Sequence, residues 1–307
     1  MSSGDSKKAI VAALGANIGI AIAKFVGFAV TRSGSLLAEA GHSVADSGNQ
    51  ALLLFGGRRA QRVADPERPF GYTRERYFFA FLVAVILFTG GAGFAAREGI
   101  DKLAHPHELS SPIVAIVILI VAIGLESFSL LTAVRAALPL RGRLGWWAFI
   151  RQSKDAELTT VLLEDTAALA GLFLALAGVG LAAATGDSMW DAVGTLAIAG
   201  LLAVVAVVLA IETKSLLIGE SATPEQIQAI RDAVASVDVF EGVLLLRTEH
   251  RGPEEILVAL KVAVAPGVTT GRLARAIDEA EANMRAAVPE ARYIFIEPDL
   301  RREGATG

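Results

Sequence analysis

Ionisable side chains occur inside long apolar runs of this sequence, where such groups are rare. His42 and Asp46 lie in one run of about 20 residues, and Glu164 and Asp165 lie in another. A charged group at the centre of a bilayer costs about 2.5–3.5 kcal/mol on insertion scales, so it faces the protein interior and usually has a task. These four residues are therefore the first candidates for chemistry.

The spacing and types of these residues suit a divalent metal ion. His42 and Asp46 are four residues apart, which places both side chains on one face of a helix. Asp165 lies in its own run at a depth compatible with theirs. Imidazole nitrogen with carboxylate oxygens suits Zn²⁺, Mn²⁺, Fe²⁺ or Co²⁺, and the absence of cysteine excludes a thiolate site.

A purely structural interpretation competes with the metal site. In it, His42 and Asp46 form a hydrogen-bonded pair that holds helices together, and Asp165 neutralises Lys24. An i,i+4 His/Asp pair alone is a weak motif, because such pairs occur by chance on many helices. Asn17, in the first apolar run, could hydrogen-bond within the site, although helix packing is the favoured role.

The elements that must position these residues are membrane spans. Hydrophobic residues make up 53% of the 307-residue chain, too many for a soluble protein of this length. We predict a membrane all-α domain over residues 1–213, a bundle of six transmembrane helices. The six apolar runs are 9–31, 35–57, 78–97, 112–135, 158–184 and 190–213.

From residue 214 onward the sequence changes to a soluble pattern. Thr223-Pro224 is typical of a helix start, with Thr as the N-cap and Pro at the first helical position. We predict a small cytoplasmic α+β domain over 214–307 in the order αββαβ. The elements after its first helix are expected at 243–247, 256–264, 270–288 and 292–297. His250, at the turn between the first two strands, is expected at the solvated surface.

The distribution of basic residues predicts the orientation. Thirteen Lys and Arg residues precede the first run or lie in the connections after the second and fourth runs, whereas the opposite connections hold Arg32, Arg97 and Lys102. By the positive-inside rule both termini are cytoplasmic, and we expect a multi-pass protein of the inner (plasma) membrane. The formal net charge of −4 argues against a nucleic-acid partner.

The segment Ser35-Leu-Leu-Ala-Glu-Ala-Gly-His42-Ser-Val-Ala-Asp46-Ser-Gly-Asn-Gln50 resembles the second transmembrane helix of the cation diffusion facilitator family. Arg68-Pro-Phe-Gly-Tyr72-Thr-Arg-Glu-Arg76 resembles the loop that follows it, and Glu164-Asp165 resembles part of the fifth helix. The resemblance covers nearly the whole chain. It implies a homodimer that exchanges a cytosolic divalent cation for protons, with metal ligands on helices 2 and 5.

The chain departs from the family pattern at the fifth helix. Zinc-transporting members carry His or Asp four residues before the conserved Asp, and here that position is Val161. One of four tetrahedral ligands is thus missing. Water, a carbonyl or Glu164 could replace it, although Glu164 could equally carry a proton or pair with Lys24. The candidate ligand set is His42, Asp46 and Asp165, with Glu164 as a further candidate.

Two other family features are altered. The loop positions that would hold His are Arg68 and Tyr72, which leave Asp65 alone, so we expect no ion there. The tail reads Phe295-Ile-Glu-Pro298 where the family often has a His-x-Glu/Asp-Pro pattern, which favours dimerisation over metal sensing. These departures resemble the branch that contains mitochondrial zinc transporters and their bacterial relatives.

The sequence predicts a secondary active transporter that moves a divalent cation out of the cytosol in exchange for protons. Zinc is favoured, with manganese, iron or cobalt as alternatives, and the metal is cargo rather than cofactor. Metal ligands must lose protons to bind, and His42 changes charge near neutral pH, so proton coupling follows. A membrane-embedded metal sensor or a channel is the alternative. An enzyme is not expected, because there is no His-Glu-x-x-His motif.

Overall fold

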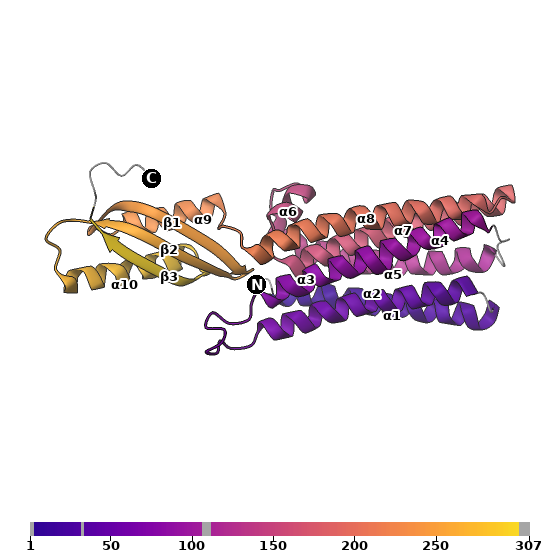
Figure 1. Cartoon of the computed structure of the whole chain (residues 1–307), viewed down its shortest axis with the longest axis horizontal. Helices are drawn as coiled ribbons and strands as arrows, with labels where there is room; N and C mark the ends of the chain where they lie inside the picture. Colours follow the sequence, from indigo (N-terminus) through magenta and orange to yellow (C-terminus); the bar gives the residue numbers. More distant parts are fainter. Residues whose placement is uncertain (1–2, 32–33, 106–111, 301–307) are drawn as a thin grey trace. The chain divides into compact units, whose positions relative to one another are not determined.

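The computed structural model describes residues 3–31, 34–105 and 112–300, without the side chains of 3–6, 27–28, 30–31, 34–42 and 45. The chain divides into two compact units, Met1–Lys214 and Ser215–Gly307. The first is helical, and its elements are drawn in Figure 1. They are α1 (Ser3–Thr31), α2 (Gly34–Ala60), α3 (Glu75–Ile86), the π-helix η1 (Leu87–Ala92), α4 (Gly93–Ala104), α5 (Pro112–Arg141), α6 (Trp146–Gln152), α7 (Ala156–Thr185) and α8 (Met189–Ile218).

Five helical segments of the described chain are long and apolar enough to cross a membrane. They are Lys7–Val26, Glu75–Ala104, Pro112–Arg141, Ala156–Thr185 and Met189–Ile218, the second of which joins α3, η1 and α4. These five agree with five of the predicted spans. The fully described stretch of α2, residues 46–60, is too short for the same criterion to apply. The membrane helical class is confirmed, and the number of six spans stays a prediction.

Close packing in the helical unit depends on small residues. Helix α2 packs against α1 and α3, and α5 packs against α1 and α7. At Gly56 of α2 an added Cβ would lie 2.6 Å from Cβ of Phe79 in α3, so only glycine permits this approach. A cluster of buried apolar residues joins α3 and η1 to α7 and α8. Its members include Ala84, Leu87, Ala167, Leu202, Ala206 and Leu209.

The second unit is a two-layer α+β domain, as predicted. Its elements are α9 (Pro224–Ala235), β1 (Phe240–Gly252), β2 (Glu255–Val264), α10 (Thr270–Ala287) and β3 (Ala291–Asp299). Thr223 caps α9 in a capping box with Gln226 and Pro224 opens the helix, so the predicted start is confirmed. The strand order is β1-β2-β3, with β1 antiparallel and β3 parallel to β2.

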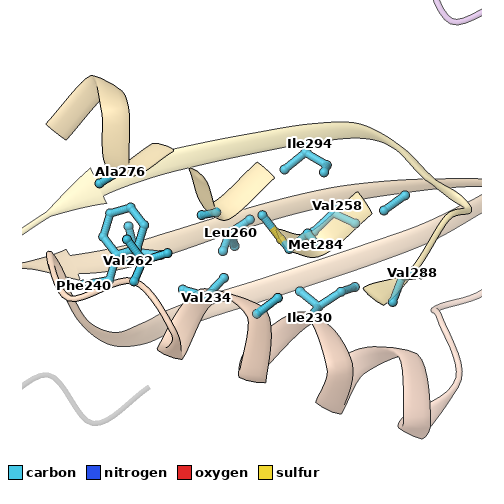
Figure 2. Packing of buried hydrophobic residues seen from close by; sticks show 14 of the residues in the cluster. Ile230, Val234, Phe240, Val258, Leu260, Val262, Ala276, Met284, Val288 and Ile294 are labelled. Carbon is cyan, nitrogen blue, oxygen red and sulfur yellow. The ribbon is translucent and has the colours of Figure 1, made fainter. Parts of the chain in front are cut away.

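The core of this domain lies between the sheet and its two helices. Figure 2 shows Ile230 and Val234 of α9 and Met284 of α10 beside the strand residues Val258 and Leu260. Alternating burial along β2 explains how one face of the strand supplies this core. Both helices cover the same face of the sheet, and the opposite face carries exposed residues such as Leu245 and Phe295.

The expectation for His250 is wrong. This residue is 2% exposed, and its Nδ1 lies 3.3 Å from the carbonyl oxygen of Gly252. Strand β1 extends to Gly252, beyond the predicted strand end at 247, and pairs His250 with the buried Ile256. Directly opposed residues of neighbouring strands point to the same face, so His250 points into the domain.

Candidate metal centre

Helix α2 carries the first two predicted ligands. Its backbone is one continuous helix from Gly34 to Ala60, so His42 and Asp46 occupy positions on one helical face. The side chain of His42 lies outside the described residues. Asp46 is partly buried.

Asp165 is the predicted ligand with the best defined surroundings. It is 2% exposed on α7, and its Oδ2 accepts a hydrogen bond of 2.6 Å from the hydroxyl of Ser129 on α5. Glu126, one turn before Ser129, is also buried and lies within electrostatic range of Asp165 and Asp46. The two predicted aspartates and a third carboxyl group therefore belong to one polar region inside the bundle.

Glu164 faces α2 and is held there by amide groups. Its Oε1 accepts from Asn49 Nδ2 at 2.9 Å, and its Oε2 accepts from Gln50 Nε2 at 2.8 Å. Gln50 in turn accepts through Oε1 from Asn17 Nδ2 of α1 at 3.1 Å. All four side chains are buried. This chain of hydrogen bonds ties α1, α2 and α7 together, and Asn17 links α1 to the candidate site residue Glu164 through Gln50.

Lys24 contacts Ser43 and not Asp165, the partner predicted by the purely structural interpretation. Its Nζ donates to the hydroxyl of Ser43 on α2 at 3.0 Å, and its charge also lies within electrostatic range of Glu126. Lys24 and Asn17 are seven residues apart on α1, and their partners Ser43 and Gln50 are seven apart on α2. The antiparallel helices α1 and α2 are thus joined by two hydrogen bonds with the same spacing on each helix, which we call the two ties.

Asp46 lies between these two ties. It follows Ser43 by three residues and precedes Gln50 by four, so it is about one helical turn from each. Ser43, Asn49 and Gln50 were not predicted from the sequence to be part of the site. Their placement three or four residues from Asp46, in an apolar run, is the pattern that could have indicated them.

The departure at residue 161 is part of the packed interior. Val161 is fully buried, one turn before Asp165 on α7. Within the described part of the chain, which omits the side chain of His42, no three His, Asp or Glu side chains form a group that could hold a metal ion. Any complete site built on Asp46 and Asp165 therefore needs His42 or other donors.

The loop after α2 is held by its own side chains. The hydroxyl of Tyr72 donates to Asp65 Oδ2, and the backbone amide of Arg68 donates to Asp65 Oδ1 at 2.8 Å. The Tyr72 bond lowers the pKa of the Asp65 carboxyl, and the Arg68 amide acts in the same direction. The guanidinium groups of Arg62 and Arg68 lie over the Tyr72 ring at 4.8 and 4.9 Å from its centroid. Asp65 is thus engaged by the residues that replace the family's histidines.

Comparison with known proteins gives matches over both units. The family model "Cation efflux transmembrane domain" matches residues 10–218, and "Cation efflux protein, cytoplasmic domain" matches residues 222–299. The Xenopus laevis "Proton-coupled zinc antiporter SLC30A9, mitochondrial" is 34% identical over 236 residues, which are 76% of this chain and 42% of that protein. The Arabidopsis thaliana "Metal tolerance protein C4" is 30% identical over 250 residues, 81% of this chain and 55% of that protein.

The chain therefore spans about half the length of these relatives or less. Among solved structures, a nickel form of the MamM C-terminal domain aligns at 18% identity with a TM-score of 0.25, covering 26% of this chain and 100% of that one. A TM-score of that size supports no inference. The transmembrane model covers most of the chain and the cytoplasmic model covers the tail, so the chain belongs to the cation efflux family, the cation diffusion facilitators.

Proposed function

We propose that this protein carries a divalent cation, zinc in the first place, out of the cytosol in exchange for protons. His42, Asp46 and Asp165 are the proposed ligands. The observation that carries the proposal is the burial of Asp165 on a membrane-spanning helix, in one polar region with Asp46. A relative named as a proton-coupled zinc antiporter supports zinc and protons as the exchanged ions.

The chemistry of the ligands supplies the coupling. Imidazole and carboxylate groups bind a metal ion only when deprotonated, so an arriving cation displaces protons and a departing cation is replaced by them. Bonds to His42 and two carboxylates replace the hydration that the cation loses when it binds. Without a cation, the low dielectric constant of the protein interior disfavours unpaired carboxylate charges, so the ligands take up protons. Alternating exposure of such a site to the two sides of the membrane gives obligatory exchange.

Glu164 is proposed to position α2 rather than to bind the cation directly. Both of its carboxylate oxygens already accept amide hydrogen bonds from α2. These two bonds orient the carboxylate toward α2, and each oxygen keeps one further lone pair. A water molecule is the simplest occupant of the fourth ligand position, as in zinc sites with three protein ligands.

The test is transport by the full chain in proteoliposomes with an imposed proton gradient and a zinc-sensitive dye inside. Asp46→Asn and Asp165→Asn keep the side-chain volume but remove a ligand charge, and each should abolish proton-driven zinc uptake. Asp187→Asn is the matched control, because Asp187 is exposed and only caps the start of α8 through the amide of Met189. Full transport by Asp46→Asn or Asp165→Asn would overturn the site.

The same assay separates a carrier from the alternatives. A carrier saturates with zinc and stops when the proton gradient is removed by an ionophore. A channel would conduct down the zinc gradient without saturation at low concentration, and a sensor would bind zinc without moving it. A panel of Mn²⁺, Fe²⁺ and Co²⁺ in the same vesicles determines the preferred cation.

We further propose that the protein is a homodimer that pairs through the open face of its C-terminal sheet. That face presents Leu245 and Phe295, which are 46% and 54% exposed, around a shallow cavity of about 370 Å³. The same face carries Arg247, Lys261 and Glu297. In a two-fold interface each copy meets the same surface of the other, so apolar groups with charges of both signs can complement themselves.

The dimer is tested with the full chain in detergent by light scattering after size exclusion. Phe295→Asp should convert most of the dimer to monomer at micromolar concentration, because it buries a charge in the proposed interface. Ala274→Asp, on the exposed side of α10, is the control and should leave the dimer intact. An unchanged dimer for Phe295→Asp would place the interface elsewhere.

A further inference from the structure

The connection between α5 and α7 displays tryptophan on its surface. Trp146 and Trp147 open helix α6, and the second of them is 57% exposed. Leu144, just before them, is exposed as well. Helices α5 and α7 both qualify as membrane spans, so the segment between them lies where the bilayer meets water. Indole side chains are enriched at that boundary, where the ring is buried and its N–H stays hydrated.

This segment has a defined shape. Gly142 adopts a φ of +55°, which lets the chain turn after α5. Arg141 stacks on Trp146 with its guanidinium carbon 4.6 Å from the ring centroid, and its Nη1 donates to the carbonyl of Leu144 at 3.1 Å. Phe149 is buried and meets Trp146 edge to face, with ring centroids 6.4 Å apart. Trp146 and Phe149 are therefore held in place beside Arg141.

The charge around these tryptophans has one sign. From Arg135 to Lys154 the sequence contains four arginines, one lysine and no acidic residue. Arg151 lies 3.6 Å from Glu212 of α8, measured from Nε to Oε1. Arg143 is exposed, and among the described residues it has neither an ion pair nor a side-chain hydrogen bond. A positive surface with exposed indole groups complements an anionic, partly apolar partner.

We propose that residues 138–151 form an interfacial site for anionic phospholipids. Trp147 and Leu144 enter the boundary between headgroups and acyl chains, while Arg143 and the stacked Arg141 contact the lipid phosphate. The bilayer is the occupant because the segment joins two of its spanning helices. Basic residues next to a membrane attract anionic lipids by about 1 kcal/mol each, which corresponds to about a five-fold enrichment per arginine. This inference does not depend on the transported cation.

Tryptophan fluorescence tests the proposal directly. The chain has three tryptophans, and Trp190→Phe leaves both remaining indoles in the proposed site. The Trp190→Phe full-length protein is reconstituted into vesicles of phosphatidylcholine, with a minor fraction of phosphatidylglycerol. Either lipid is brominated at carbons near the glycerol end of the acyl chain. We expect bromine on the minor anionic lipid to quench emission several-fold more than the same fraction of brominated phosphatidylcholine.

Two variants in the Trp190→Phe background separate headgroup recognition from simple insertion. Arg143→Gln should reduce the preference for brominated phosphatidylglycerol by about five-fold, with emission and insertion otherwise unchanged. Arg272→Gln, at an exposed position of α10, is the matched control and should keep the preference. Equal quenching by the two brominated lipids would overturn the anionic preference. Emission that is quenched by aqueous iodide but by neither lipid would overturn the insertion of the segment.

Discussion

Substitution of Glu164 separates a metal ligand from a residue that positions α2. In Glu164→Gln the new amide can still accept from Gln50, whose orientation is fixed because its Oε1 accepts from Asn17. Asn49 can turn over, since its Oδ1 accepts no hydrogen bond from the described residues. Both hydrogen bonds are then kept in neutral form. The loss of charge assistance is about 1 kcal/mol per bond, offset in part because no carboxylate is buried.

Glu164→Leu has a different result. It leaves the NH₂ groups of Asn49 and Gln50 buried without acceptors, which costs about 1–3 kcal/mol each. The total is about 2–6 kcal/mol, with the lower end favoured because hydrogen bonds between membrane helices average about 0.6 kcal/mol in double-mutant cycles. We therefore expect the free energy of unfolding of Glu164→Gln to lie within about 1 kcal/mol of that of the unmodified protein. Glu164→Leu should unfold at a clearly lower denaturant concentration.

The assays are reversible unfolding in mixed micelles and zinc affinity by competition with a chelating dye. Glu164→Gln should keep its zinc affinity within about ten-fold, the lower limit of outer-shell effects on metal sites. Asp165→Asn should lose measurable binding. The positioning role is refuted if Glu164→Gln loses zinc binding as completely as Asp165→Asn while its unfolding midpoint stays unchanged.

Three further substitutions test the packing and the missing ligand. Gly56→Ala should cost about 1–3 kcal/mol in micelle unfolding because its Cβ meets Phe79, whereas Gly48→Ala, whose Cβ meets nothing within 4 Å, should be neutral. Arg76→Ala should cost several kcal/mol by leaving Glu157 buried without its partner at 3.6 Å, and adding Glu157→Gln should restore part of the loss. Val161→Asp should raise zinc affinity about ten-fold or more by supplying a fourth ligand, and Val161→Asn should not.

Much of the fold could be predicted because it follows from periodicity and local chemistry. Apolar runs set the spans through the thickness of the bilayer, and Thr223-Pro224 set the start of α9 through capping. His250 could not be placed, because its burial depends on β1 extending to Gly252 and on the pairing with Ile256. Strand length is decided by tertiary pairing, which a short sequence window does not contain.

The candidate site divides in the same way. Asp46 and Asp165 could be named because ionisable groups are conspicuous in apolar runs, and whether they bind metal stays a prediction. Asn49 and Gln50 were missed because uncharged amides are less conspicuous, although they determine what Glu164 contacts. Only the hydrogen bonds between α2 and α7 show that Glu164 points to these amides, and the placement of helices depends on the packing of the whole bundle.

Helix α2 carries polar side chains inside the helical unit, and they find partners there. Each polar group that lacks a partner in hydrocarbon is costly, and here Ser43 and Gln50 both take partners from α1. Because the two ties are seven residues apart on each helix, sliding or rotating α2 on α1 would break both. Asp46, between the ties, is therefore fixed relative to α1. In the proposed exchange, we therefore expect the site to reach the two sides of the membrane through movement of other helices against the α1–α2 pair.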